Sequence, residues 1–319
     1  MKAFSYERVQ SPVEAVAAHR HRPAARYIAG GTNLIDLMKL EIETPTHLID
    51  INDAGLDGIE DMPDGSIRIG ALVSNTDLAS DQRIRTHYPI VARSILAGAS
   101  GQLRNMATVG GNLMQRTRCP YFYDLNLPCN KRNPGTGCSA MGGYSRTHAI
   151  VGIGSCICAF LGDMSVALRL LDAVVEVMRP DGAIRTVPIG NFHKAPGHGE
   201  VIDEFALETG ELIVAVLLPA PLSGSFAYHK VRDRASFAFA LVSVAVVLFA
   251  DGSGRVALGG VGTKPWRSEE GDAALTLGAK AASEALLTNA LPTEHNRYKV
   301  ELTERAMAAA LEDAQRVEQ

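Results

Sequence analysis

Residues 101–154 restrict the fold of this chain more than any other part of its sequence. The segment is rich in Gly, Asn, Arg and Cys and has little hydrophobic periodicity. Ordinary connections run about 4 to 6 residues, so an aperiodic stretch of roughly 50 residues indicates a functional loop or one held by a ligand. We therefore expect regular structure on both sides of a long, irregular, functional segment.

The sequence before this segment alternates short strands and helices. Ser11-Pro12-Val13-Glu14 is typical of a capped helix start, and the helix is predicted to continue to about residue 21. Further strands are predicted at 3–6, 25–29, 47–51 and 67–73, and helices at 33–39 and 83–99, the last broken at Pro89.

The sequence after this segment predicts a helix at 163–171 and strands at 173–178, 184–187 and 212–218. Pro219-Ala220-Pro221 indicates a domain boundary. Beyond it we predict strands at 225–232, 237–249 and 255–260, the last two forming a hairpin, and helices at 274–287 and 293–317.

Charge and hydropathy exclude two classes of partner. The chain has 31 Lys and Arg against 35 Asp and Glu, a net charge of −4, without the basic stripe that nucleic-acid binding requires. Its longest nearly apolar run, 238–250, is shorter than the roughly 20 residues of a membrane span. Residues 1–7 lack the apolar core of a secretory signal, so we expect no export signal in this chain.

Two glycine-rich turns are the main candidates for binding a dinucleotide. Ala29-Gly30-Gly31-Thr32-Asn33 follows a predicted strand, and Thr108-Val109-Gly110-Gly111-Asn112-Leu113 repeats the double glycine about 80 residues later. Backbone N–H groups in such turns can point toward one diphosphate. Each loop could alternatively be a plain strand-to-helix turn. The presence of two such loops in one chain favours dinucleotide binding.

These turns resemble the two diphosphate loops of the FAD-binding subunits of the molybdenum hydroxylases, the xanthine dehydrogenase and carbon monoxide dehydrogenase group. The sequence GGVGTKPWR at 259–267 is similar to the signature of that family's C-terminal domain. The resemblance covers essentially the whole chain. It implies an α+β fold with a two-subdomain FAD-binding domain of the PCMH type, similar to vanillyl-alcohol oxidase, and a C-terminal α+β domain of the carbon monoxide dehydrogenase flavoprotein type.

The resemblance also implies domain bounds. The FAD-binding domain is expected at 1–219, with subdomains at about 1–55 and 56–219 and an insertion at about 116–157, and the C-terminal domain at 222–319.

The same resemblance implies non-covalent FAD and a set of contact residues. From the two loops and from single positions these are Arg26, Tyr27, Ile28, Ala29, Gly30, Gly31, Thr32, Asn33, Leu34, Thr108, Gly111, Asn112, Asp124, Asp163 and Lys230. For the last three, the residues alone leave alternatives open. Asp124 could be a solvated loop carboxylate, Asp163 a helix N-cap and Lys230 a surface lysine. His193 and His198 are interpreted as loop residues, and no catalytic residue is predicted.

The five cysteines are the candidate metal ligands. Four thiolates from one irregular segment can bind a [4Fe–4S] cluster, and a zinc site or unligated buried cysteines are the alternatives. The insertion is similar to that of bacterial periplasmic aldehyde oxidoreductases, whose FAD subunits carry such a cluster. This resemblance favours Cys119, Cys129, Cys138 and Cys156 as ligands, with Cys158 as the alternative to Cys156.

Several basic residues lie near these cysteines in sequence, namely Arg104, Arg116, Arg118, Lys131 and Arg132. Cations near an anionic cluster would raise its reduction potential. A solvated basic loop is the alternative.

The function implied is that of an oxidoreductase subunit that passes electrons from an iron–sulfur subunit to FAD and then to an external acceptor. The expected partners are a molybdenum-binding large subunit with the molybdopterin cofactor and a [2Fe–2S] small subunit, together a heterotrimer. Localisation is expected to be periplasmic by export on a partner's signal, and otherwise cytoplasmic. A free-standing FAD oxidoreductase and a zinc-stabilised binding module are the alternatives.

Overall fold

The computed structural model describes residues 1–197 and 204–316, and the chain in it forms three β-sheets. The first is a parallel sheet of three short strands in the order β1-β3-β2. Its elements are β1 (Ser5–Arg8), α1 (Pro12–His21), β2 (Arg26–Ile28), α2 (Leu34–Lys39) and β3 (His47–Asp50). The predicted cap of α1 is confirmed, because Ser11 Oγ accepts a hydrogen bond from the backbone N–H of Glu14 at 3.2 Å.

The second sheet is antiparallel and has the strand order β4-β5-β8-β6-β7. Its strands are β4 (Ile59–Asp61), β5 (Ile67–Gly70), β6 (Val174–Met178), β7 (Ile184–Pro188) and β8 (Leu212–Leu218). The helices of this part are α3 (Asn75–Ser80), α4 (Gln82–His87), α5 (Pro89–Ala97), α9 (Asp163–Leu170) and α10 (Ile189–Phe192).

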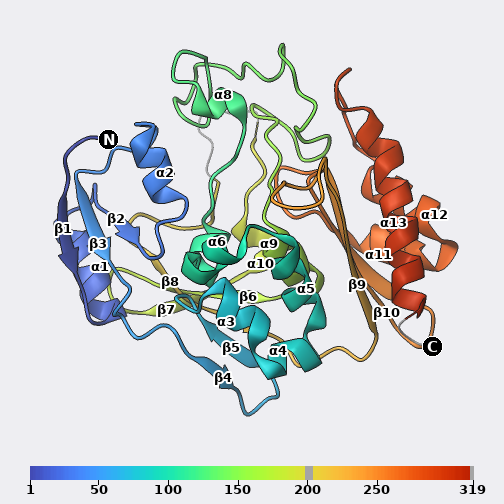
Figure 1. Cartoon of the computed structure of the whole chain (residues 1–319), viewed down its shortest axis with the longest axis horizontal. Coiled ribbons are helices and arrows are strands. Elements are labelled where there is room, and N and C mark those ends of the chain that lie inside the picture. The colour runs from blue at the N-terminus through green and yellow to red at the C-terminus, as the bar shows by residue number, and fades with distance from the viewer. Residues whose placement is uncertain (198–203, 317–319) are drawn as a thin grey trace.

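The third sheet, in the order β11-β10-β9, belongs to the C-terminal part of the chain. Its elements are β9 (Ser225–Val231), β10 (Val242–Leu248), β11 (Gly254–Gly259), α11 (Glu269–Ala273), the 3₁₀ helix η1 (Ala274–Leu277), α12 (Ala279–Leu286) and α13 (Tyr298–Arg316). The predicted hairpin is confirmed as the antiparallel pair β10 and β11. Helix α13 packs along β9 and β10 (Figure 1).

One hydrophobic core joins the second and third sheets. Buried side chains of α5 and α9, such as Ile95 and Leu168, share a cluster with Val216 of β8 and Val247 of β10. Burial of apolar surface on both sides therefore fixes these two helices between the sheets.

The aperiodic segment contains three short helices, α6 (Gly101–Met106), α7 (Val109–Leu113) and α8 (Pro120–Tyr123), and is otherwise irregular as far as α9. The loops around α8 project beyond the sheets, between α2 and α13 in the view of Figure 1. The second diphosphate loop predicted from sequence thus lies on α7, and the cysteines lie in or near the projecting loops.

Several predicted element boundaries are wrong. The strand predicted at 237–249 starts at Val242, and Phe237 has a φ of +51°, which is incompatible with an extended strand. The helix predicted at 274–287 is interrupted by Gly278 at φ +96°, and the helix predicted from residue 293 begins at Tyr298. Strand β4 was not predicted, and β1 lies two residues later than expected.

The mixture of sheets and helices is the α+β fold that the sequence predicts. Among the residues that the structure describes, no helix is both long enough and apolar enough to cross a membrane.

Candidate functional site

The first glycine loop can form only with glycine at its centre. It connects β2 to α2, and Gly31 has a φ of +70°, in the left-handed region. A Cβ on Gly30 would lie 1.6 Å from the carbonyl oxygen of Met106. The first loop therefore lies directly against the residues that precede the second loop.

The second glycine loop is held by the end of β5. Thr108 caps α7, since its Oγ1 accepts the backbone N–H of Gly111 at 3.2 Å. The backbone N–H groups of Val109 and Gly110 donate to the carbonyls of Val73 and Ala71, at 3.0 and 2.8 Å. This backbone pairing fixes the second loop opposite the first.

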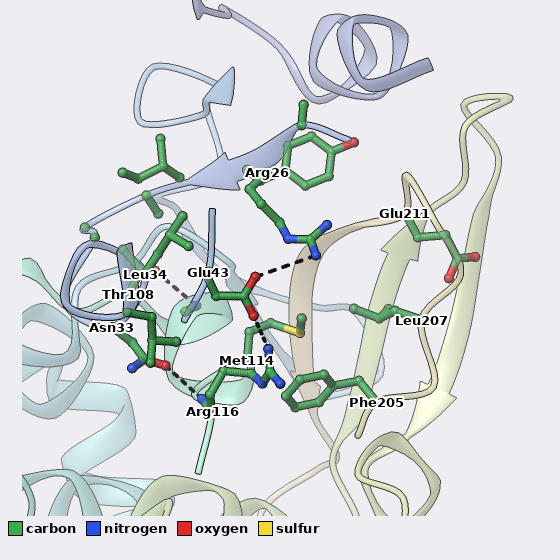
Figure 2. A pocket seen from close by; sticks show the side chains of 18 of the residues that line it. Arg26, Asn33, Leu34, Glu43, Thr108, Met114, Arg116, Phe205, Leu207 and Glu211 are labelled. Carbon is green, nitrogen blue, oxygen red and sulfur yellow. Dashed lines mark hydrogen bonds and ion pairs between the residues drawn. The ribbon is translucent and has the colours of Figure 1, made fainter. Parts of the chain in front are cut away.

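A cavity of about 490 Å³ lies along the first loop and reaches the second. It is lined by all nine loop residues predicted from 26 to 34 and by Thr108 and Gly111. Segment 204–211 forms its opposite wall, with Phe205, Leu207 and Glu211 across the cavity from Arg26 (Figure 2). Tyr27 donates its hydroxyl to the carbonyl of Gly210 in this wall at 2.8 Å.

Ion pairs cross one side of this cavity. Glu43 lies between Arg26 and Arg116, at 3.8 Å from Arg26 and in direct contact with Arg116 (Figure 2). Arg116 also pairs with Glu204 at 2.9 Å. Burial disfavours the charged form of Arg116, but the two carboxylates outweigh burial and raise its pKa.

A second cavity of about 430 Å³ meets the first at the glycine loops. Thr32, Asn33, Ala107 and Gly111 line both cavities, and Asn112 lines the second. An elongated molecule bound between the loops would therefore reach into both. This shape fits a dinucleotide.

Two polar side-chain atoms at the second cavity are buried without a hydrogen-bond partner among the described residues. Asn33 accepts the backbone N–H of Arg116 through Oδ1 at 2.8 Å, but its Nδ2 makes no hydrogen bond within 1–197 and 204–316. Asn75 Oδ1 is likewise unpaired. Buried polar groups nearly always have partners, so one unpaired donor and one unpaired acceptor fit a site that binds a polar ligand.

Asp163 and Lys230 line the second cavity together, as a buried ion pair. Lys230 Nζ lies 2.8 Å from Asp163 Oδ2, and the two side chains are 4% and 9% exposed. Asp163 also accepts the hydroxyl of Tyr228 at 2.6 Å, and burial together with Asp163 raises the pKa of that hydroxyl. Asp163 is the first residue of α9, and the N-cap of this helix is Gly162. Lys230 lies on the edge strand β9, but its side chain is buried and does not face solvent.

Asp124 does not lie at either cavity. It is exposed, and its carboxylate accepts the backbone N–H of Asn126 at 2.9 Å in a local turn. The predicted contact between Asp124 and the flavin thus has no support in this structure. His193, interpreted as a loop residue, is buried and contacts the carbonyl of Leu113 at 3.0 Å, and His198 lies outside the described residues.

All five cysteines are unpaired by disulfides and line one small cavity of about 10 Å³. Cys129 and Cys138 face each other in an antiparallel bridge, and Cys156 and Cys158 are both buried. Burial raises the pKa of Cys119 to about 12, whereas hydrogen bonds with Cys156 lower the pKa of Cys138 and Cys158. Within 1–197 and 204–316, no three His, Cys, Asp or Glu side chains are arranged to hold a single metal ion.

The basic residues near the cysteines have separate roles in the structure. Arg104 and Arg118 line the second cavity, and Arg132 donates to the carbonyls of Tyr121 and Phe122. Lys131 lines the cysteine cavity, where burial opposes its charge but Cys158 and Glu204 raise its pKa. The segment is therefore not a solvated basic loop.

The cysteine cavity adjoins the two larger cavities. A space of about 20 Å³ is lined by Gln115 of the second cavity, by Arg116 of the first, and by Lys131 and Cys158 of the cysteine cavity. The cysteine cavity and the cavities at the glycine loops are therefore neighbours that share lining residues with the small space between them.

Sequence reasoning missed several residues that line the two large cavities. They include Glu43, Asn75, Ser94, Phe205, Leu207, Glu211 and Phe239. None stands in a motif, and only the fold brings them to the glycine loops.

Comparisons with known proteins identify the family. Residues 2–221 match the family described as the FAD binding domain in molybdopterin dehydrogenase. The chain is 59% identical over 315 residues, 98% of its length and 99% of the relative's, to the aldehyde oxidoreductase FAD-binding subunit PaoB of Escherichia coli. It is 28% identical to the carbon monoxide dehydrogenase medium chain of Afipia carboxidovorans, over 84% of this chain and 78% of that one.

Solved structures agree with the sequence relatives. A chain of carbon monoxide dehydrogenase from Hydrogenophaga pseudoflava matches with a TM-score of 0.75 and 26% identity, over 98% of both chains. The chain thus belongs to the FAD-binding medium subunits of the molybdenum hydroxylase family and is a subunit of an oxidoreductase.

Proposed function

We propose that this chain is the FAD- and [4Fe–4S]-carrying electron-transfer subunit of a molybdenum-dependent aldehyde oxidoreductase. The observation that carries the proposal is the proximity of the five-cysteine cavity to the cavities at the glycine loops. A cluster and a flavin in adjoining sites suit electron transfer. The aldehyde substrate is proposed from the name of the 59% identical relative.

FAD is proposed to lie across the two large cavities, with its diphosphate at the glycine loops. The contacts are the predicted residues of the first loop, together with Thr108, Gly111, Asn112, Asp163 and Lys230, and without Asp124. Asn33 Nδ2 and Asn75 Oδ1 would gain hydrogen-bond partners from the bound cofactor. The domain bounds predicted from sequence are part of the same proposal.

Replacing Gly31 with Val is expected to abolish FAD retention. A left-handed φ costs a non-glycine residue roughly 1–2 kcal/mol, and more when the residue is β-branched. The new Cβ would also lie 3.0 Å from Cγ1 of Ile35, so the Ile35 side chain on α2 must give way by a few tenths of an ångström.

Gly55→Val is the matched control for this substitution. Gly55 has the same φ of +70°, but a Cβ there meets no atom within 4 Å, and Gly55 lines neither cavity. Flavin content after gel filtration should be lost in Gly31→Val and kept in Gly55→Val. Full retention in both variants would reject the loop as the diphosphate site.

The [4Fe–4S] cluster is proposed to bind Cys119, Cys129, Cys138 and Cys156. Support comes from the convergence of all five thiols and from the buried cation of Lys131 beside them. Because the space between the thiols is only about 10 Å³, their loops would have to spread around a cluster.

Metal analysis of the purified chain tests this proposal directly. We expect about four iron and four acid-labile sulfide per chain, the composition of one cubane cluster. Zinc, or no metal, in anaerobically purified protein would refute the cluster and favour a structural zinc site or inert thiols.

The proposal includes a molybdenum-binding large subunit and a [2Fe–2S] small subunit as partners in a heterotrimer. Relatives named as medium chains or FAD-binding subunits support a multi-subunit enzyme. Periplasmic localisation, by export of the folded complex on a partner's signal, belongs to the same proposal and is supported by the family resemblance alone.

A further inference from the structure

His148 lies in the cysteine segment, and its ring contacts a predicted cluster ligand. The residue is 2% exposed, and its Nε2 lies 3.2 Å from Sγ of Cys119. Its other ring nitrogen, Nδ1, is buried and makes no hydrogen bond in the described part of the chain. The polar contact of this ring is therefore directed at a thiol.

The unpaired nitrogen indicates where the ring proton lies. A proton on Nδ1 would be a buried donor without an acceptor, which costs roughly 1–3 kcal/mol. A thiolate, the form in which cysteine binds metal, can only accept a hydrogen bond. With Cys119 ionised, the favoured arrangement is a neutral His148 that donates Nε2–H to the sulfur.

The C-terminal part of the chain holds the backbone on both sides of His148. Five consecutive carbonyls accept hydrogen bonds from residues 291–299, which we call the clamp. The pairs are Arg146 O with Tyr298 Oη at 3.0 Å, Thr147 O with Lys299 Nζ at 3.3 Å, His148 O and Ala149 O with Asn296 Nδ2 at 3.3 Å, and Ile150 O with the backbone N–H of Leu291 at 2.7 Å.

The clamp is rigid where it meets His148. Asn296 and Lys299 are both fully buried, and Lys299 also donates to the carbonyl of Gly260 at 2.6 Å. Residues 146–150 are thereby tied to the third sheet and to the start of α13. An irregular segment thus acquires a fixed backbone at the position from which the imidazole reaches Cys119.

We propose that His148 is a positioning residue of the iron–sulfur site, which donates Nε2–H to the Cys119 sulfur and is held in place by the clamp. The inference rests on the proposed cluster. Hydrogen bonds to ligand sulfurs stabilise the more negative, reduced form of a cluster and raise its potential. His148 and the clamp would then set how readily the cluster accepts an electron.

The test compares His148→Gln with His148→Met in the full chain, by anaerobic redox titration followed by electron paramagnetic resonance. Gln and Met are similar in size, but only Gln has a side-chain N–H to donate. We expect a negative shift of the cluster potential in His148→Met and a potential near wild type in His148→Gln. His47→Met is the control, because His47 is also buried but lies on β3, lines neither the large cavities nor the cysteine cavity, and contacts Glu7 and Arg22 instead of a thiol.

The clamp is tested by a double-mutant cycle. Asn296→Ala should shift the potential in the same direction as His148→Met, and should add no further shift in the His148→Met background. Equal potentials in wild type, His148→Gln and His148→Met would overturn the inference, as would loss of the cluster from both His148 variants alike. Zinc or no metal in the wild-type chain would overturn the proposed function, whereas iron with unchanged potentials overturns only the role of His148.

Discussion

The purified chain, with flavin and cluster intact, should not bleach its flavin absorbance when mixed anaerobically with aldehydes. Oxidation of an aldehyde to a carboxylic acid takes oxygen from water and releases two electrons and two protons. In the proposed heterotrimer that step belongs to the molybdenum subunit, and the protein around a flavin supplies position and electrostatic tuning. The cavities of this chain are instead arranged around two glycine loops and a set of thiols.

Adding the two partner subunits should change this result completely. With a molybdenum subunit and a [2Fe–2S] subunit present, we expect aldehyde-dependent bleaching at a rate typical of enzymes, on the order of 1 to 1,000 per second. Reduction of the isolated chain by dithionite is the control that its flavin is competent. Bleaching of the isolated chain by aromatic or aliphatic aldehydes would reject the heterotrimer and support a free-standing FAD oxidoreductase.

The turn at the first glycine loop was predictable because its backbone requirement is local. A left-handed φ at Gly31 favours a residue without a Cβ, and the double glycine displays this requirement in the sequence, whereas the close approach of Gly30 to Met106 comes from the fold. The Ser11 cap and the β10–β11 hairpin were predictable for the same reason. Each depends on a few neighbouring residues.

The rest of the site depends on contacts between distant segments. Asn75 and Phe205 reach the cavities because β5 and β8 pair in one sheet, and His148 reaches Cys119 because residues 291–299 hold its backbone. No motif or residue spacing in the sequence predicts these contacts. Asp124 fails for the opposite reason, since its proximity to Cys119 in sequence does not bring it to the cavity.

Sequence periodicity does not decide whether Cys156 or Cys158 is the fourth proposed cluster ligand. Side chains two residues apart on a strand point to the same face, and in this structure both thiols are 5% exposed at the cysteine cavity. The backbone N–H of Cys158 even lies 3.5 Å from Cys156 Sγ. Neither burial nor position separates the two thiols, so the distinction requires substitution.

Single Cys→Ser changes at Cys119, Cys129, Cys138 and Cys156 should each remove most of the iron, whereas Cys158→Ser should keep it. Serine preserves the size of the side chain but lacks the thiolate that the cluster needs. Even changes to residues that hydrogen-bond to metal ligands typically weaken metal binding about 10- to 100-fold, so loss of a ligand itself should cost at least as much. Iron and sulfide content, with the cluster absorbance, measures the result.

Cys158→Ser is the matched control in this series, because it changes a thiol of equal burial beside the same cavity. Any general damage from placing a hydroxyl there would appear in this variant too. Normal iron in Cys156→Ser with loss in Cys158→Ser would assign Cys158 as the fourth ligand. Normal iron in all five variants would show that no single one of these thiols is needed to hold iron, and would reject Cys119, Cys129, Cys138 and Cys156 as the defined ligand set.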